Sequence, residues 1–253
     1  MIYAGKSIQV VGLDDHIAEL SFNAQGAPVN VFSVDVVAEL SAALDALEAD
    51  FTCKGLIVTS AKQVFIAGAD ITEFLTLFQS GAAAIKSGTV NNNRNYNRLE
   101  ELTMPVVAAI NGAALGGGFE LCLSCDYRIA SFNALIGLPE CSLGIIPGWG
   151  GTVRLPRIAG FETAVEWIAF AQHQNAETGL KAGVLDAVVA PESLRAAALR
   201  TVRQCLDGTG ANPWRTGRRA RQDHLSPRFR WRLSLNFMKP NEQANRKSNY
   251  QGK

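Results

Sequence analysis

The sequence predicts an α/β domain built around a mainly parallel β-sheet. Three apolar runs have the length and composition of buried strands, at residues 56–60, 105–110 and 126–130. Each is separated from the next by a segment in which helical spacing or capping signals recur. Strand–helix–strand repeats of this length favour right-handed crossovers, which place successive strands side by side in parallel.

The remaining elements follow the chain in order. Alternating apolar residues at 8–11 and 17–22 predict an antiparallel hairpin before the first parallel strand. Residues 34–48 carry an apolar stripe at helical spacing and predict a helix. Residues 79–93 are small and polar, so they are predicted as a mobile connection before a helix that ends near Leu102. Beyond the sheet we expect helices at 163–170, 177–182 and from 191 to about 205, with a short strand at 184–189.

The basic residues are concentrated at the C-terminal end of the chain. The net charge is +1, but residues 1–213 hold 13 Lys and Arg against 21 Asp and Glu, whereas residues 214–253 hold 11 against 2. A cluster of Gly, Asn and Pro at 207–213 separates the two parts. We therefore predict a core at 1–206 and a basic, helical extension at 207–253, which ends without a closing helix, as a truncated chain would.

This tail mixes arginines with aromatic residues such as Trp214 and Phe229, and two interpretations stay open. Such a mixture is typical of a nucleic-acid surface, which would make the tail an RNA-binding module. More often it marks a helical appendage whose aromatic side chains pack on the body or a partner while the arginines face water. The second interpretation is the one we favour from the sequence.

Neither the cysteines nor the histidines form a pattern typical of a disulfide or metal site. The five cysteines are odd in number and scattered, so a reducing, cytoplasmic compartment is predicted. Cys122 and Cys125 have no second pair and no nearby histidine, and are interpreted as small core residues rather than zinc ligands. His16, His173 and His224 stand in unrelated segments and are not expected to be catalytic. No signal peptide or apolar run of membrane length is seen, so no membrane association is expected.

The stretch that most suggests chemistry is residues 111–120, Asn-Gly-Ala-Ala-Leu-Gly-Gly-Gly-Phe-Glu. It joins the strand at 105–110 to a helix-like segment through Gly116, Gly117 and Gly118, which let the backbone approach a ligand closely. The start of a helix also presents unpaired N–H groups that suit a phosphate or a developing oxyanion. A glycine triplet alone is more often a tight turn with close helix packing.

Two glutamates and a second turn accompany this stretch. Glu120 falls in the first turn of the helix, and Glu140 lies downstream in the Leu-Pro-Glu of residues 138–140. Taken singly, each is more simply a carboxylate that favours a helix dipole. Residues 65–73 repeat the strand-to-helix construction, with Asp70 as an N-cap. Two such turns could each donate one N–H to a single carbonyl oxygen.

Together these motifs resemble those of the crotonase (enoyl-CoA hydratase/isomerase) superfamily over roughly residues 1–200. The matching stretches, in that family's order and spacing, are 66–71, 111–120, 137–140 and 144–152. Details at 70–74 and 97–101 look most like the amino-terminal hydratase/isomerase part of bacterial multifunctional fatty-acid oxidation α subunits. The resemblance implies a crotonase-like spiral of ββα units followed by C-terminal helices.

The resemblance also implies a role for each motif residue. Glu120 would activate the water that attacks C3 of a trans-2-enoyl thioester, and Glu140 would deliver a proton to C2. The N–H groups of Ala69 and Gly117 would form the oxyanion hole, and Trp149 would belong to the wall of the acyl pocket. The other residues implied in substrate binding are Ala67, Gly68, Asp70, Ile71 and Gly116. No metal, flavin or nicotinamide cofactor is implied, since coenzyme A is part of the substrate.

The leading interpretation is therefore an enoyl-CoA hydratase of fatty-acid β-oxidation that also isomerises Δ3 to Δ2 double bonds. The alternative within the superfamily is another acyl-CoA reaction, such as dehalogenation, decarboxylation or thioester hydrolysis, which the pair of glutamates disfavours. Crotonase-like domains usually form trimers or hexamers, whereas the α subunits assemble with a thiolase β subunit. The resemblance implies one of these two assemblies.

Overall fold

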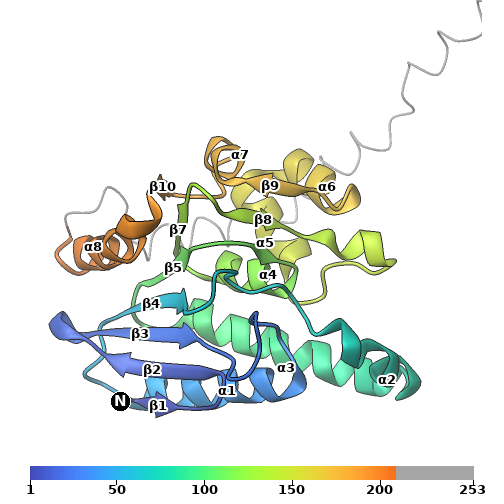
Figure 1. Cartoon of the computed structure of the whole chain (residues 1–253), viewed down its shortest axis with the longest axis horizontal. Helices are drawn as coiled ribbons and strands as arrows, with labels where there is room; N and C mark the ends of the chain where they lie inside the picture. The colour runs from blue at the N-terminus through green and yellow to red at the C-terminus, as the bar shows by residue number, and fades with distance from the viewer. Residues whose placement is uncertain (209–253) are drawn as a thin grey trace, which may run out of the picture.

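The computed structural model describes residues 1–208, and its centre is a seven-stranded sheet of order β1-β2-β3-β4-β5-β7-β10 (Figure 1). Its strands are β1 (Tyr3–Ala4), β2 (Ile8–Gly12), β3 (Ile17–Phe22), β4 (Gly55–Ser60), β5 (Val106–Ile110), β7 (Tyr127–Ser131) and β10 (Ala187–Val189). The first three strands pair antiparallel, and every later pair is parallel. The predicted hairpin and the mainly parallel sheet are therefore confirmed.

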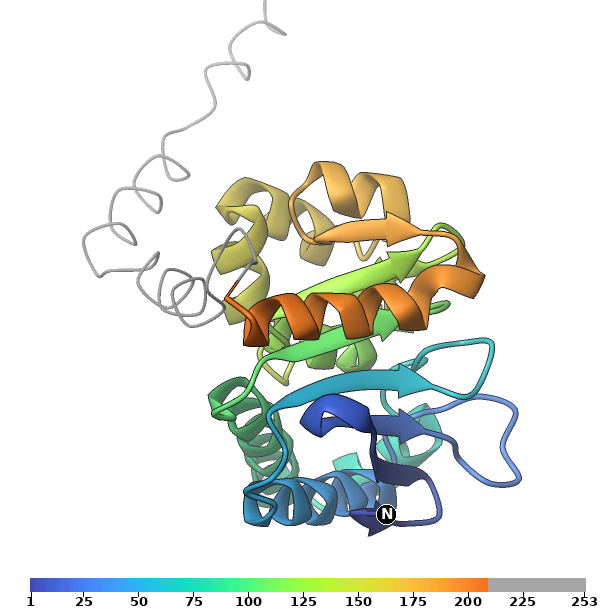
Figure 2. The ribbon, with the colours of Figure 1, turned by 90° about the vertical axis from the view of Figure 1, so that its left-hand side faces the viewer.

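The two faces of this sheet are covered by different helices (Figure 2). One face is covered by three helices, α1 (Val34–Ala49), α3 (Ala82–Glu101) and α4 (Gly117–Ser124). The other face is covered by α8 (Leu194–Leu206). Because side chains alternate along a strand, β5 sends Val106 and Ala108 to the first core and Val107 to the second. Both faces are buried, which explains why the central strands are continuous apolar runs.

A smaller sheet brings distant segments beside one another. Its strands are β6 (Ala114–Leu115), β8 (Leu135–Gly137) and β9 (His173–Asn175). Isolated parallel bridges extend it, one between Ile66 and Ala114 and one between Phe32 and Ala69. The turn at 65–73 therefore lies between Phe32 and the start of the glycine stretch. Three helices complete the C-terminal half: α5 (Gly151–Ala159), α6 (Phe161–Ala169) and α7 (Ala176–Lys181).

The prediction of a mobile connection at residues 79–93 is wrong. After α2 (Phe74–Gln79), the 20-residue helix α3 begins at Ala82 and runs through the whole polar segment. Contacts that the local sequence does not reveal hold its asparagines. Asn95 Nδ2 donates to Val37 O at 3.0 Å, and Asn93 Nδ2 donates to Gly148 O at 2.7 Å. Tertiary packing here outweighs the weak helix propensity of glycine and asparagine.

The helices predicted after residue 160 are confirmed, whereas the strand predicted at 184–189 is shorter and the strand β9 was not predicted. Helices form at α6, at α7 and at α8, which follows the short 3-10 helix η4 (Pro191–Ser193). The strand predicted at 184–189 is shorter, because the N–H groups of Val184 and Leu185 donate to Gly179 O and pairing with β7 begins only at Ala187. No sequence pattern indicated α5, a helix that contains Pro156.

Cys122 on α4 and Cys125, directly after this helix, lie in the core. Both are buried, and their thiols donate to Gly118 O and Leu121 O. Among residues 1–208, no group of three or more His, Cys, Asp or Glu side chains is arranged to hold a metal ion. Over that same range, none of the helices combines the length and apolar character needed to cross a membrane. The predicted extension, apart from residues 207 and 208, and the possible nucleic-acid surface lie outside the described residues.

Candidate active site

The two glycine-bearing turns converge. Gly68 and Gly116 both have positive φ, 98° and 49°, a conformation that favours glycine. A Cβ on Gly68 would lie 3.2 Å from Leu115 O, and a Cβ on Gly116 would lie 3.7 Å from Gly68 Cα. The backbones are in contact at this junction, and a side chain on Gly68 would crowd the carbonyl oxygen of Leu115.

Two backbone donors border this junction. Phe32 N–H donates to Gly68 O and Asp70 N–H donates to Phe32 O, so this parallel bridge leaves the N–H of Ala69 on the side away from Phe32. Helix α4 begins at Gly117, and the first N–H groups of a helix have no acceptor within it. Among residues 1–208, neither the Ala69 N–H nor the Gly117 N–H has an acceptor. Both donors are therefore available to a bound oxygen.

Glu120 is buried directly below the glycine turn and is only 1% exposed. Its Oε1 accepts hydrogen bonds from the N–H groups of Trp149 and Gly151, each at 2.8 Å. Burial raises the pKa of Glu120 to about 7, and the negative charge of Glu140 adds to this rise. The two amide hydrogen bonds and the positive charge of Arg154 act in the opposite direction.

Glu140 lies on the short helix η3 (Pro139–Leu143) and is 9% exposed. A Cβ on Gly116 would lie 3.1 Å from its Oε1, so the glycine turn contacts this carboxyl group directly. Its Oε2 is buried and has no hydrogen-bond partner among the described residues. Burial raises the pKa of Glu140 to about 7. Two neighbouring carboxyl groups that titrate near neutral pH can divide the roles of general base and general acid.

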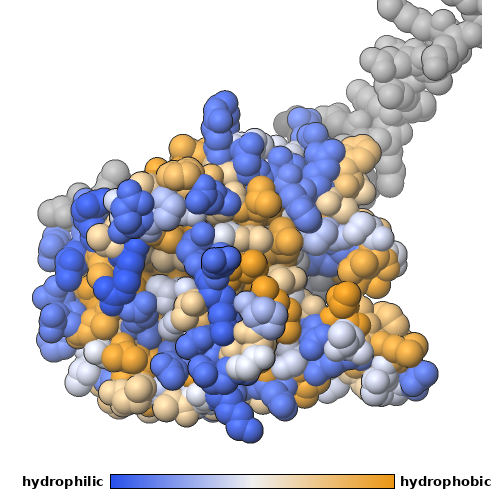
Figure 3. Space-filling view, in the orientation of Figure 1, coloured by the Kyte–Doolittle hydropathy of each residue, from blue (hydrophilic) through white to orange (hydrophobic). Residues whose placement is uncertain are grey.

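A groove of about 980 Å³ opens beside the junction, between α1, α2 and α3. Ala69 and Asp70 lie at its edge and Trp149 forms one of its walls. The Trp149 ring packs edge to face against Phe32 and Tyr96, with ring centroids 5.7 and 6.2 Å apart. Figure 3 shows apolar side chains along the side of the molecule on which α2 lies, where Leu75 and Phe78 are exposed. The groove itself is lined by both apolar and polar side chains, among them Phe74, Leu77 and Asn92.

The other predicted binding residues surround the first turn. Ala67 and Ile71 are exposed, and Gly68 is buried against the second turn. The Asp70 carboxylate accepts from the N–H of Thr72 at 2.9 Å and from its hydroxyl at 2.6 Å, so this side chain stabilises the turn.

Three polar residues near the glutamates were not predicted from the sequence. Tyr96 is fully buried and donates from its hydroxyl to Gly117 O at 2.7 Å. Arg154 and Asn93 contact the loop that holds Glu120. Tyr96 had a detectable signal, because it shares one helical face with Leu99, whereas a short sequence pattern does not reveal the contacts of the other two.

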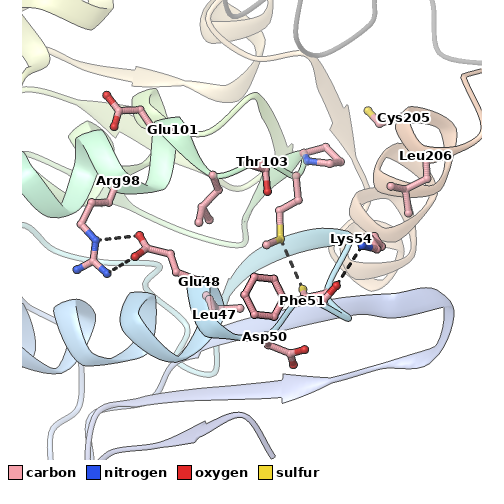
Figure 4. Close-up of a pocket in the computed structure, with 14 residues that line it drawn as sticks. Leu47, Glu48, Asp50, Phe51, Lys54, Arg98, Glu101, Thr103, Cys205 and Leu206 are labelled. Atoms are coloured by element: carbon pink, nitrogen blue, oxygen red, sulfur yellow. Dashed lines mark hydrogen bonds and ion pairs between the residues drawn. The ribbon is translucent and has the colours of Figure 1, made fainter.

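A second cavity, of about 810 Å³, lies away from this site (Figure 4). It is formed where α1, α3 and α8 end, beside the amino ends of β4 and β5. Inside it, Arg98 pairs with Glu48 and the Cys53 thiol lies 3.5 Å from Met104 Sδ. None of the residues predicted for the active site lines this cavity.

The fold and this pair of turns define a crotonase-type protein, and the comparisons with known proteins agree. Residues 14–214 match the model of the enoyl-CoA hydratase/isomerase family, and the chain belongs to this family. An enoyl-CoA hydratase from Bacillus anthracis has a TM-score of 0.73 at 28% identity, covering 92% of this chain and 97% of its own. The resemblance found in the sequence and the crotonase-like fold with C-terminal helices are both confirmed.

The relatives in sequence are much longer proteins. The fatty acid oxidation complex subunit alpha of Pseudomonas syringae pv. tomato is 51% identical over 208 residues, which are 82% of this chain and 29% of that protein. The protein of the same name from Pseudomonas aeruginosa is 52% identical over the same shares. The chain therefore spans less than a third of the length of these curated relatives.

Proposed function

We propose that this protein is an enoyl-CoA hydratase that adds water across the trans-2 double bond of enoyl-CoA thioesters. One observation carries the proposal: two buried glutamates, each with a pKa near 7, flank a junction where two backbone N–H groups lack acceptors among the described residues. Membership in the enoyl-CoA hydratase/isomerase family supports the substrate class. The arrangement supplies the donors and the acid–base pair that hydration requires.

In the proposed reaction, the thioester oxygen accepts hydrogen bonds from Ala69 and Gly117. Glu120, ionised, takes a proton from water as the oxygen of that water bonds to C3. The negative charge that builds on the thioester oxygen is stabilised by the two amides. Glu140, protonated, then gives its proton to C2, which restores the thioester and yields the 3-hydroxyacyl product. One proton passes back from Glu120 to Glu140 to complete the cycle.

We assign substrate binding to the groove and to the first turn. Coenzyme A would contact the backbone of residues 67–71, and the acyl chain would enter the groove of about 980 Å³ with Trp149 as one wall. We further propose Δ3–Δ2 isomerisation as a second reaction and β-oxidation as the context, because the curated relatives are fatty acid oxidation proteins. Assembly as a homotrimer or hexamer, or with a thiolase β subunit, belongs to the same proposal and is tested by native mass measurement.

The first test is hydration of crotonyl-CoA, followed by loss of absorbance from the conjugated thioester. We expect turnover by the wild-type protein and a loss of about 100-fold or more in Glu120→Gln and in Glu140→Gln, since each removes a general acid–base group. Glu192→Gln, a change at an exposed glutamate, is the matched control and should retain full activity. A folded wild-type protein without hydratase activity would contradict the proposal.

A 3-enoyl-CoA separates the two reactions. Moving the double bond requires one group that carries a proton from C4 to C2, whereas hydration requires two groups. We therefore expect Glu140→Gln to lose both activities and Glu120→Gln to lose hydration while isomerisation continues. Equal loss of isomerisation in both variants would contradict the division of roles between the two glutamates.

A further inference from the structure

We propose that Arg154 and Asn93 are positioning residues that hold the loop at residues 148–151 and so aim the general base Glu120. The inference rests on the proposed function and assigns roles to two residues outside the glycine and glutamate motifs. Neither residue is placed to touch the reacting atoms. Asn93 acts through one of the peptide groups that hydrogen-bond to Glu120, and the Arg154 side chain acts through the peptide that lies between those two groups.

The first peptide group of the loop is held at both ends. Its carbonyl, Gly148 O, accepts from Asn93 Nδ2 at 2.7 Å, and its amide, the N–H of Trp149, donates to Glu120 Oε1 at 2.8 Å. A peptide group is planar, so fixing the carbonyl also fixes the direction of the N–H. Asn93 Nδ2 also donates to Thr89 O on its own helix, which ties this peptide to α3.

Residue 154 contacts the next two peptide groups, the first through the arginine side chain and the second through its backbone. Its Nη1 donates to Trp149 O at 3.2 Å, and its backbone N–H donates to Gly150 O at 2.8 Å. Gly150 O lies at the opposite end of the peptide whose N–H, on Gly151, donates to Glu120 Oε1. Both N–H groups that bind Glu120 therefore belong to peptides whose carbonyl oxygens have fixed donors.

Arg154 is itself anchored to α3. It is 5% exposed, its Nε donates to Glu100 Oε2 at 3.0 Å and its Nη2 donates to Asn97 Oδ1 at 2.7 Å. Gly150 has φ of 106°, and a side chain there would overlap the guanidinium group. The planar fork of arginine reaches three acceptors at once, which a lysine ammonium on a flexible stem does not reproduce.

The charge of Arg154 also affects the pKa of Glu120, so its substitution should change how Glu120 titrates. The charged and titratable groups that act on Glu120 are Glu140 on η3, Arg154 on α5 and Tyr96 on α3. Arg154 lowers the pKa of Glu120, whereas burial and Glu140 raise it. Glu100 neutralises part of the Arg154 charge, so removing Glu100 strengthens the field of the arginine on Glu120. Loss of Arg154 and loss of Glu100 should therefore move the titration of Glu120 in opposite directions.

The test compares pH profiles of kcat/KM for crotonyl-CoA hydration by the full chain. We expect Arg154→Met to lower kcat about 10- to 100-fold through misplacement of the base, with KM nearly unchanged. The acidic side of its pH profile, which follows the ionisation of Glu120, should move to higher pH by about one unit. In Glu100→Gln the same side of the profile should move to lower pH. Arg154→Lys keeps the positive charge, so it should restore the position of the acidic side of the profile while kcat stays low. Asn93→Ala should lower kcat and displace the profile less than Arg154→Met does.

Arg98→Met is the matched control, because Arg98 lies on α3 and pairs with Asp45 and Glu48 on α1, away from the loop that binds Glu120 (Figure 4). It should leave kcat and the pH profile unchanged. The proposed positioning role would be wrong if the acidic side of the pH profile moved in the same direction in Arg154→Met and Glu100→Gln. It would also be wrong if that side of the profile stayed fixed in both variants while kcat fell. If Arg154→Met does not fold, the Glu100→Gln variant serves as the test: the acidic side of its pH profile must move to lower pH for the proposal to stand. An inactive wild-type protein would refute the proposed function instead, so the two failures are distinguishable.

Discussion

The burial of Glu120 costs the folded protein stability at neutral pH, and the cost can be measured. The pKa of this carboxyl group rises from 4.5 to about 7 on folding. Below pH 4.5 both states are protonated and there is no cost. Between the two pKa values the unfolded chain releases the proton while the folded protein keeps it. Above pH 7 the full penalty applies, about 3 kcal/mol for a shift of this size.

Replacing the group by an amide should remove this pH dependence. The amide oxygen introduced by Glu120→Gln can still accept from the N–H groups of Trp149 and Gly151. We therefore expect the free energy of unfolding of the variant, relative to wild type, to rise by about 2–3 kcal/mol between about pH 5 and about pH 8. The measurement is urea denaturation at both pH values, with Glu192→Gln, at an exposed position, as control. The same variant should lose hydration.

One outcome of the urea measurements would contradict this prediction. If the difference between Glu120→Gln and wild type were the same at both pH values, the carboxyl group would titrate alike in the folded and unfolded states. The reasoning from burial would then be wrong, whatever the activity of the variant. Comparing the same variant at two pH values matters because constant differences between the amide and the acid cancel.

Three further changes test the surroundings of the two glutamates. Gly117→Ala would overlap the Trp149 ring, so kcat/KM should fall about tenfold, and Trp149→Leu in the same chain should restore part of it. Tyr96→Phe removes the buried donor to Gly117 O and should lower the free energy of unfolding by about 1–3 kcal/mol in urea titrations. Gly116→Ala forces a methyl group at positive φ toward Glu140 Oε1 and should destabilise by about 1–3 kcal/mol by the same measurement.

The sequence was informative wherever a backbone constraint selects one residue type. Gly68 and Gly116 need positive φ and close approach, so their turns could be predicted from the local order of apolar run, glycines and helical segment. The apolar runs of the central strands follow in the same way from burial on both faces. That these turns meet could not be worked out from spacing. It depends on the bridge between Ile66 and Ala114, which joins segments 48 positions apart.

The polar residues that hydrogen-bond to the loop beside Glu120 could not be predicted from the sequence, for a related reason. Asn93 reaches Gly148 across 55 positions, and its neighbours on α3 have a local pattern typical of a connection. An asparagine in a helix has the same local signature whether it is solvated or bonded to a distant carbonyl. Only the packing of α3 against the loop distinguishes these cases, and that packing is a property of the whole fold.

The surroundings of the two glutamates also indicate which of them holds the proton. Both pKa values lie near 7, so the values alone do not assign the roles of acid and base. The donors differ: the Glu120 anion has two amide N–H groups and the charge of Arg154, whereas Glu140 Oε2 has no partner among residues 1–208. A proton on Glu120 would leave Glu140 as a buried anion with an oxygen that no described donor reaches, the less stable arrangement. We therefore infer that the shared proton rests on Glu140, which makes it the acid and Glu120 the base.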